Sequence, residues 1–198
     1  WKTFNNSREN KRKLVSFLGD QFLALAKKHF FPDRSLYIDG AFPSDPNVTY
    51  KIKWLVEDSQ HYFSVMADDS FYNNHIEGDT KVFLHAVKTS FQKCLIYSPD
   101  NDIYHIALPL VSVHSTKEVI VQTRDTAAVK SYVNINTILS SLSSMYSDLS
   151  LDQTCLATHL QNLFICTGCD FVSFWLKKTK PRMYNIFLSN FVFIANHR

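Results

Sequence analysis

Two pairs of acidic residues flank one stretch of this 198-residue chain, and one residue separates the members of each pair. Glu77 and Asp79 precede a segment with helical spacing, whereas Asp100 and Asp102 follow a short apolar run. Side chains at positions i and i+2 of extended backbone point to the same side. Asp100 and Asp102 are therefore expected to face one site if the strand conformation continues past Pro99.

The order of these segments predicts that the four carboxylates meet. Open α/β sheets place their sites at the carboxyl ends of strands, and a right-handed crossover brings a strand end and a helix start to the same edge. Carboxylates gathered there repel one another unless cations bind, and hard oxygen ligands select Mg²⁺ or Mn²⁺. The same residues also allow a purely structural interpretation, in which Glu77 and Asp79 cap a helix and Asp100 and Asp102 belong to a turn.

A third acidic segment, Thr167-Gly168-Cys169-Asp170, follows another apolar run. Together with Glu77-Gly78-Asp79-Thr80 and Ser98-Pro99-Asp100-Asn101-Asp102, it resembles the acidic motifs of PIN-like nuclease domains of the flap-endonuclease (XPG-type) kind. The resemblance is closest to a divergent version in transposon-associated proteins of animals and covers about residues 77–176. Gly78 stands where that version usually has Ala, and Asn101 where it usually has Thr, so neither change removes an acid.

This resemblance implies a fold, an activity and a set of ligands. The implied fold is one α/β domain over residues 1–198, with a mostly parallel central sheet, helices on both faces, and the first strand of the family missing from this fragment. The implied activity is hydrolysis of nucleic-acid phosphodiester bonds, with DNA favoured as the substrate, by water activated on Mg²⁺ or Mn²⁺. The resemblance assigns both the metal-binding and the catalytic role to Glu77, Asp79, Asp100, Asp102 and Asp170.

Three further sets of residues leave alternatives open. Asp39 ends a predicted strand and is a candidate for the early acid of the family, but a turn residue before Gly40 is favoured. The spacing of Cys155, His159, Cys166 and Cys169 matches no zinc-finger pattern. Buried thiols on an apolar helix are therefore favoured over a zinc site. Candidate phosphate contacts, each also interpretable as an ordinary surface charge, are Lys88, Lys93, Lys177, Lys178, Lys180 and Arg182.

A second hypothesis retains the nuclease-derived fold but not the catalytic activity. In this hypothesis the chain is a catalytically inactive, nuclease-derived module that binds nucleic acid or protein within a transposon-derived protein. The net charge of +3 permits a nucleic-acid partner but does not demand one. The sequence predicts no oligomeric state.

Composition excludes several other classes. No apolar run has the length of a membrane span, so no membrane partner is expected. Four cysteines are too few and too unevenly spaced for a disulfide framework, which favours a reducing compartment, the nucleus or the cytoplasm. With only four glycines, the chain contains no P-loop and no dinucleotide fingerprint.

The hydrophobic periodicity predicts alternating helices and strands. Ser7 is the expected N-cap of the first helix, and residues 117–123 and 129–133 are expected to form a hairpin. The predicted helices cover residues 7–30, 80–89, 103–108, 135–146 and 151–166, the predicted strands cover 35–38, 48–54, 62–66 and 94–97, and a buried C-terminal element covers 184–195.

Overall fold

The computed structural model of the chain describes residues 7–29, 34–39, 47–72, 78–147, 151–168 and 180–190. The chain divides into two compact units, Trp1–Lys81 and Val82–Arg198. The division falls inside helix α3 (Gly78–Lys88). The described residues of each unit contain a three-stranded sheet and a hydrophobic cluster of buried side chains.

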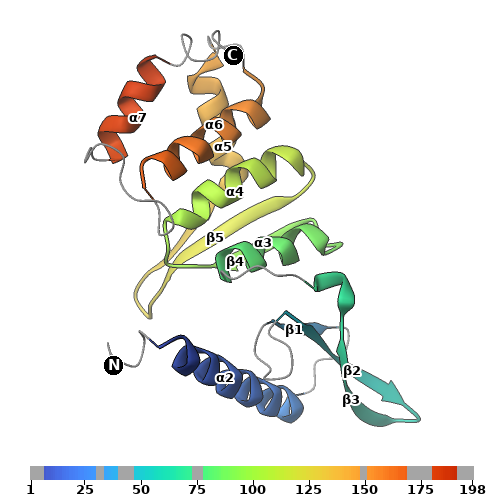
Figure 1. Cartoon of the computed structure of the whole chain (residues 1–198). Helices are drawn as coiled ribbons and strands as arrows, with labels where there is room; N and C mark the ends of the chain where they lie inside the picture. The colour runs from blue at the N-terminus through green and yellow to red at the C-terminus, as the bar shows by residue number, and fades with distance from the viewer. Residues whose placement is uncertain are drawn as a thin grey trace. The chain divides into compact units, whose positions relative to one another are not determined.

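The first unit combines one long helix with an antiparallel sheet. Helix α2 (Arg8–Lys28) follows Ser7, whose side-chain oxygen accepts a hydrogen bond from the backbone N–H of Asn10 at 3.3 Å, so the predicted N-cap is confirmed. The sheet has the order β1-β2-β3 and is followed by a short 3-10 helix, η1 (Figure 1). These elements are β1 (Ser35–Asp39), β2 (Thr49–Glu57), β3 (Gln60–Ala67) and η1 (Asp69–Phe71).

Trp54 of β2 joins this sheet to α2. Its indole N–H donates to the carbonyl oxygen of Ala26 at 3.2 Å, and both side chains belong to the cluster around Ile52. The hairpin between β2 and β3 turns through Asp58 and Ser59, whose φ angles of 49° and 63° are both positive. A two-residue turn with positive φ at both positions matches the twist of antiparallel strands. The turn therefore fixes β2 and β3 as an antiparallel pair.

The second unit has a mixed sheet of order β4-β5-β6. Strands β4 and β5 are parallel and joined through helix α4, whereas β5 and β6 form an antiparallel pair, so the predicted hairpin is confirmed. The elements are β4 (Lys93–Tyr97), α4 (Asp102–Val113), β5 (Glu118–Asp125), β6 (Lys130–Asn134), α5 (Ile135–Met145), α6 (Gln153–Cys166) and α7 (Lys180–Ser189).

One face of the β4-β5-β6 sheet carries the core of the second unit. Ile96 lies opposite Val121 in the parallel register, and both side chains are almost fully buried. They pack with buried residues of α4, α5 and α6, which lie together beside β5 (Figure 1). Alternation along β4 turns Leu95 and Tyr97 to the opposite face, where they are 60% and 62% exposed.

The predicted fold class is wrong in one respect. The described residues form two small sheets, one antiparallel and one mixed, and not one extended, mostly parallel central sheet. Tight turns allow only antiparallel pairing, whereas parallel pairing needs a long crossover. Among the described strands, β4 and β5 are the one parallel pair, and helix α4 forms the crossover between them.

Two other predictions concern apolar segments. Residues 184–195 were expected to be buried, but no residue of α7 is fully buried, and 191–195 lie outside the described residues. None of the described helices is long and apolar enough to cross a membrane.

Candidate functional site

Asp100 and Asp102 lie at the carboxyl end of β4, as predicted, but on a turn and not on continued strand. The strand ends at Tyr97. The N–H of Asp100 donates to the Ser98 hydroxyl oxygen at 3.2 Å, and the N–H of Asp102 donates to the Asp100 carboxylate at 3.1 Å. The argument that these two side chains share one side, because they are two residues apart on extended backbone, therefore does not apply. Asp100 stabilises the start of α4, and Asp102 is the first residue of that helix.

Asp79 is in the first turn of α3, where a negative charge interacts favourably with the helix dipole. Two residues later, the ammonium group of Lys81 lies 3.3 Å from a carboxylate oxygen of Asp39, and the two side chains are only 15% and 14% exposed. Asp39, the candidate for the early acid, is thus in a mostly buried ion pair at the end of β1. This contact explains its charge without a metal ion.

The other two predicted ligands, Glu77 and Asp170, lie outside the described residues, as do Lys177 and Lys178. Among the described residues, no three His, Cys, Asp or Glu side chains lie close enough together to hold a metal ion. The oxygen donors suit Mg²⁺ or Mn²⁺ by type. The described acids alone do not complete a site for either ion.

A cluster of side chains from three helices lies beside the first turns of α4. The His105 ring stacks on Phe164 of α6, with centroids 4.2 Å apart and planes 11° from parallel. The Tyr184 hydroxyl of α7 lies 3.3 Å from Nδ1 and 3.4 Å from Nε2 of His105. The Lys180 ammonium lies 4.1 Å from the centroid of the Phe164 ring. Asp102 precedes His105 by three residues, so their side chains lie on the same face of α4.

The protonation states in this cluster follow from burial and from the neighbouring charges. Burial lowers the pKa of His105 to about 4, and the positive charge of Lys180 acts in the same direction. Burial raises the pKa of Tyr184 to about 12, and the negative charge of Asp102 adds to this effect. At neutral pH His105 is therefore uncharged and Tyr184 keeps its proton, so the hydroxyl can donate to an imidazole nitrogen.

Sequence reasoning missed most of this cluster. The position of His105, one turn after Asp102, was the only available signal. Tyr184 is 79 residues away from His105, and no pattern in the sequence pairs them. The cluster joins the start of α4, which carries Asp102, to the end of α6, and Asp170 follows α6 in the sequence.

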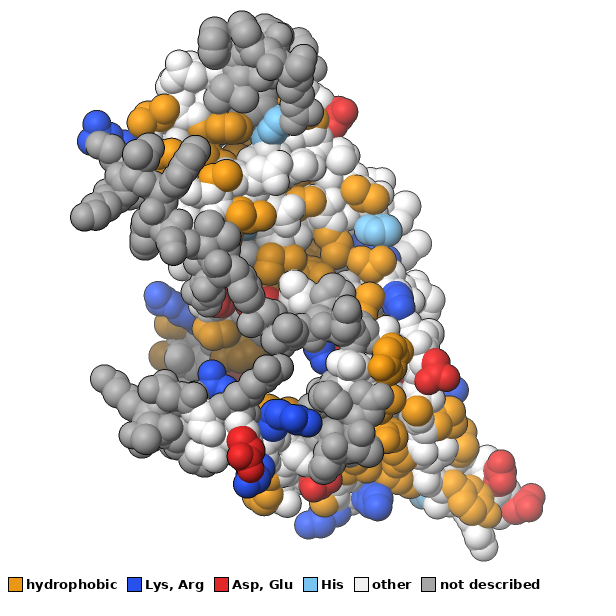
Figure 2. Space-filling model, viewed as in Figure 1, with side chains coloured by type: hydrophobic (Ala, Val, Ile, Leu, Met, Phe, Trp, Pro, Cys, Tyr) orange, Lys and Arg blue, Asp and Glu red, His pale blue; other side chains and the backbone are white. Residues whose placement is uncertain are grey.

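Two of the described basic residues proposed as phosphate contacts are engaged with other side chains. Lys93 forms an ion pair with Glu118 at 2.8 Å, and Lys180 covers the Phe164 ring. Arg182 and Lys88 are exposed. Figure 2 shows the described Lys and Arg side chains of one face as separate spots, without one continuous basic patch. Their arrangement on this face does not single out a nucleic-acid surface.

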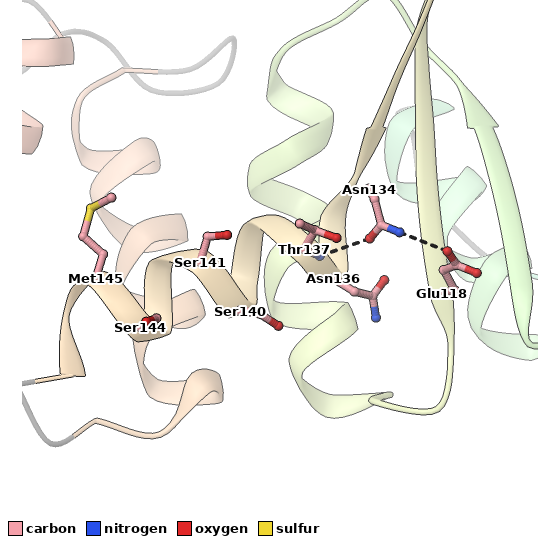
Figure 3. Close-up of a pocket in the computed structure, with 8 residues that line it drawn as sticks. All are labelled: Glu118, Asn134, Asn136, Thr137, Ser140, Ser141, Ser144 and Met145. Atoms are coloured by element: carbon pink, nitrogen blue, oxygen red, sulfur yellow. Dashed lines mark hydrogen bonds between the residues drawn. The ribbon is translucent and has the colours of Figure 1, made fainter.

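An open pocket of about 900 Å³ lies where α5 meets β5 and β6 (Figure 3). Two asparagines that line this pocket form hydrogen bonds with neighbouring strands and with the helix. Asn134 donates to Glu118 at 3.0 Å and accepts from the N–H of Thr137 at 3.0 Å (Figure 3). Asn136 binds the backbone of Val119 and of Lys117. None of the predicted acids lines this pocket, so we do not assign it the chemistry expected from the sequence.

Comparisons with known proteins give no match: no protein-family model, no curated protein and no solved structure matches the chain. The described part of the chain is an α/β protein of two compact units.

Proposed function

We propose that this chain is a nuclease-like domain that hydrolyses nucleic-acid phosphodiester bonds with the help of divalent metal ions. DNA is the favoured substrate, and the nucleus or the cytoplasm is the proposed compartment. The stacking of His105 on Phe164 carries the proposal. His105 lies one helical turn after Asp102, and Phe164 lies three residues before Thr167, where the third acidic motif begins. This contact brings the start of α4 and the end of α6 together.

The position of Asp100 and Asp102 also supports the proposal. Both follow β4, which is parallel to β5, and sites of α/β proteins form at the carboxyl ends of such strands. Asp102 is half-buried, and its charge acts on Tyr184. Its carboxylate is an oxygen ligand of the type that Mg²⁺ and Mn²⁺ prefer.

The proposed ligands are the carboxylates of Glu77, Asp79, Asp100, Asp102 and Asp170. Glu77 and Asp170 have to complete the set, because the described residues alone do not form one. These carboxylates would hold Mg²⁺ or Mn²⁺, which would supply an activated water and charge stabilisation for phosphodiester hydrolysis. No protein nucleophile would be required.

The test is cleavage of end-labelled DNA by the full chain in Mn²⁺ or Mg²⁺. Single-stranded DNA, flap DNA and RNA of the same sequence are compared as substrates. We expect metal-dependent cleavage that Asp102→Asn abolishes and that Asp20→Asn, a change at an exposed acid of α2, leaves intact. Circular dichroism establishes that both variants are folded. Cleavage by Asp102→Asn at the rate of the unchanged chain contradicts the proposed role of Asp102.

A second function is favoured by one observation. The described acids form no group of three, which fits a nuclease-derived module that binds nucleic acid or protein without cleaving. Fluorescence anisotropy with labelled DNA in EDTA separates the two functions. Saturable binding without metal, together with no cleavage when Mn²⁺ is added, supports the inactive module over the nuclease.

A further inference from the structure

Strand β4 has one side without a partner strand among the described residues, since the sheet order is β4-β5-β6. The N–H of Ser98 donates to Gln122 at 3.1 Å, and the carbonyl of Gln92 accepts from Glu118 at 2.7 Å. These two bonds show which residues of the strand point toward β5. Because backbone groups alternate along a strand, the N–H and C=O groups of Lys93, Leu95 and Tyr97 point away from β5, toward the open edge.

The side chains of these same residues share one face of the sheet. Leu95 and Tyr97 are 60% and 62% exposed. Natural edge strands are normally protected by charges, prolines or bulges. Here the single charge of the strand is Lys93 at its first position, which is paired with Glu118 at 2.8 Å, and Pro99 lies beyond the end of the strand. The edge is therefore suited to pairing with another strand.

We propose that β4 of a second copy of this chain pairs with β4 across this edge, antiparallel and centred on Leu95. The β4-β5-β6 sheets of the two copies then form one continuous sheet around a two-fold axis. Leu95 lies opposite the partner's Leu95, and Lys93 lies opposite the partner's Tyr97. All three outward-pointing residues of each strand contribute both their N–H and their C=O groups to the pairing.

The sequence of β4 favours this partner and this direction. Read in reverse, Lys-Cys-Leu-Ile-Tyr places a cation opposite an aromatic ring at both ends and leucine opposite leucine in the centre. A parallel arrangement in register instead places Lys93 opposite the partner's Lys93, where the like charges repel. Self-complementarity in the antiparallel direction thus argues for a second copy of the same strand.

The first unit already contains a pair of the proposed kind. Tyr37 of β1 lies directly opposite Lys51 of β2 in an antiparallel register. The Lys51 ammonium lies 5.1 Å from the centroid of the Tyr37 ring. A lysine and a tyrosine placed opposite each other on antiparallel strands of this protein therefore make the contact that the dimer requires.

Sedimentation velocity of the full chain at increasing concentration tests this inference. We expect a concentration-dependent dimer whose dissociation constant rises by about tenfold or more in Leu95→Lys, which places two like charges at the two-fold axis. Val56→Lys, a change at an exposed residue of β2, is the matched control and should leave the dimer unchanged. A chain that stays monomeric at all concentrations, or a dimer that Leu95→Lys does not weaken, overturns the proposal.

Disulfide cross-linking tests the proposed register independently if the Leu95→Lys variant fails to fold. Residues directly opposite each other in a hydrogen-bonded antiparallel pair have Cα atoms about 5.5 Å apart, which is within disulfide range. Leu95→Cys is therefore expected to form a disulfide-linked dimer under mild oxidation, beyond the level of the unchanged chain with its native cysteines. Equal amounts of linked dimer in both proteins contradict the proposed register.

Discussion

His105 and Phe164 stack ring on ring, with their centroids 4.2 Å apart. The Lys180 ammonium lies 4.1 Å from the centroid of the same Phe164 ring. Residues of α4, α6 and α7 therefore meet at Phe164, directly beyond the helix start that carries Asp102. This contact supports our proposal that the second and third acidic motifs belong to one site.

Replacing Phe164 should loosen this junction. Phe164 is only 7% exposed, so Phe164→Ala leaves a cavity and removes the stacking partner of His105. We expect a loss of about 3 kcal/mol in the free energy of unfolding, measured by urea denaturation. Phe17→Ala, at a side chain that is 57% exposed, should change this free energy by less than about 0.5 kcal/mol. Equal effects of the two changes contradict the packing described for Phe164.

The stability of the protein should depend on pH through His105. Burial and the nearby Lys180 lower the pKa of His105 to about 4, below the ordinary histidine value of 6.5. A lowered histidine pKa favours folding above pH 6.5, and this contribution is lost as the pH falls from 6.5 toward 4. The free energy of unfolding of His105→Gln should therefore fall less steeply across this window than that of the unchanged chain.

The matched control for this pH dependence is His61→Gln, because His61 is exposed on β3. Its pH profile should follow that of the unchanged chain. Tyr184 and Asp102 also lie near His105, and both are retained in these variants. A His105→Gln profile that is as steep as the others shows that burial of His105 has no measurable effect.

Tyr184→Phe isolates the contact between α7 and α4. The change removes the hydroxyl that lies 3.3 Å from His105 but keeps the ring. We expect the free energy of unfolding to fall by about 1 kcal/mol at pH 7. Tyr62→Phe provides the comparison, because the Tyr62 hydroxyl contacts only Gln60 on the surface in the described structure, and it should have a smaller effect. A loss in Tyr62→Phe that equals the loss in Tyr184→Phe argues against a stabilising bond to His105.

A substitution in the turn between β2 and β3 should increase the free energy of unfolding instead of decreasing it. Ser59 has a φ of 63°, in the left-handed region that glycine adopts more easily than other residues. Ser59→Gly should raise the free energy of unfolding of the first unit by about 0.5–1 kcal/mol. Ser141→Gly, in the middle of α5, should instead destabilise the second unit by about 0.5 kcal/mol. Thermal unfolding of both variants checks the two signs, and a lower melting temperature for Ser59→Gly contradicts the turn assignment.

Much of the local structure could be predicted from the sequence, because it depends on neighbouring residues. The helical spacing between Ser7 and Pro32 predicted a helix at 7–30, and α2 occupies Arg8–Lys28. The alternation after Lys117 predicted the hairpin that β5 and β6 form. Local periodicity and capping are sufficient for elements of this kind.

The arrangement of the elements depended on information that spacing does not carry. Nothing in residues 35–67 shows that these strands form a sheet separate from that of β4. The sequence allowed either continued strand or a turn after Pro99. The hydroxyl of Ser98 and the carboxylate of Asp100 accept local hydrogen bonds that form the turn into α4. Such side chain to backbone bonds compete with extended structure.

The candidate site was predictable only in part. The sequence placed Asp100 and Asp102 at the end of a strand, which the structure confirms. It could not identify Tyr184 as a neighbour of His105, because that contact arises from packing between α4 and α7.

Isothermal titration of the metal-free full chain with Mn²⁺ tests the central claim most directly. The proposed acidic site predicts saturable binding that Asp102→Asn strongly weakens and that Asp20→Asn leaves unchanged. The absence of saturable binding, or equal Mn²⁺ affinity in Asp102→Asn and the unchanged chain, would contradict a metal site built on Asp102.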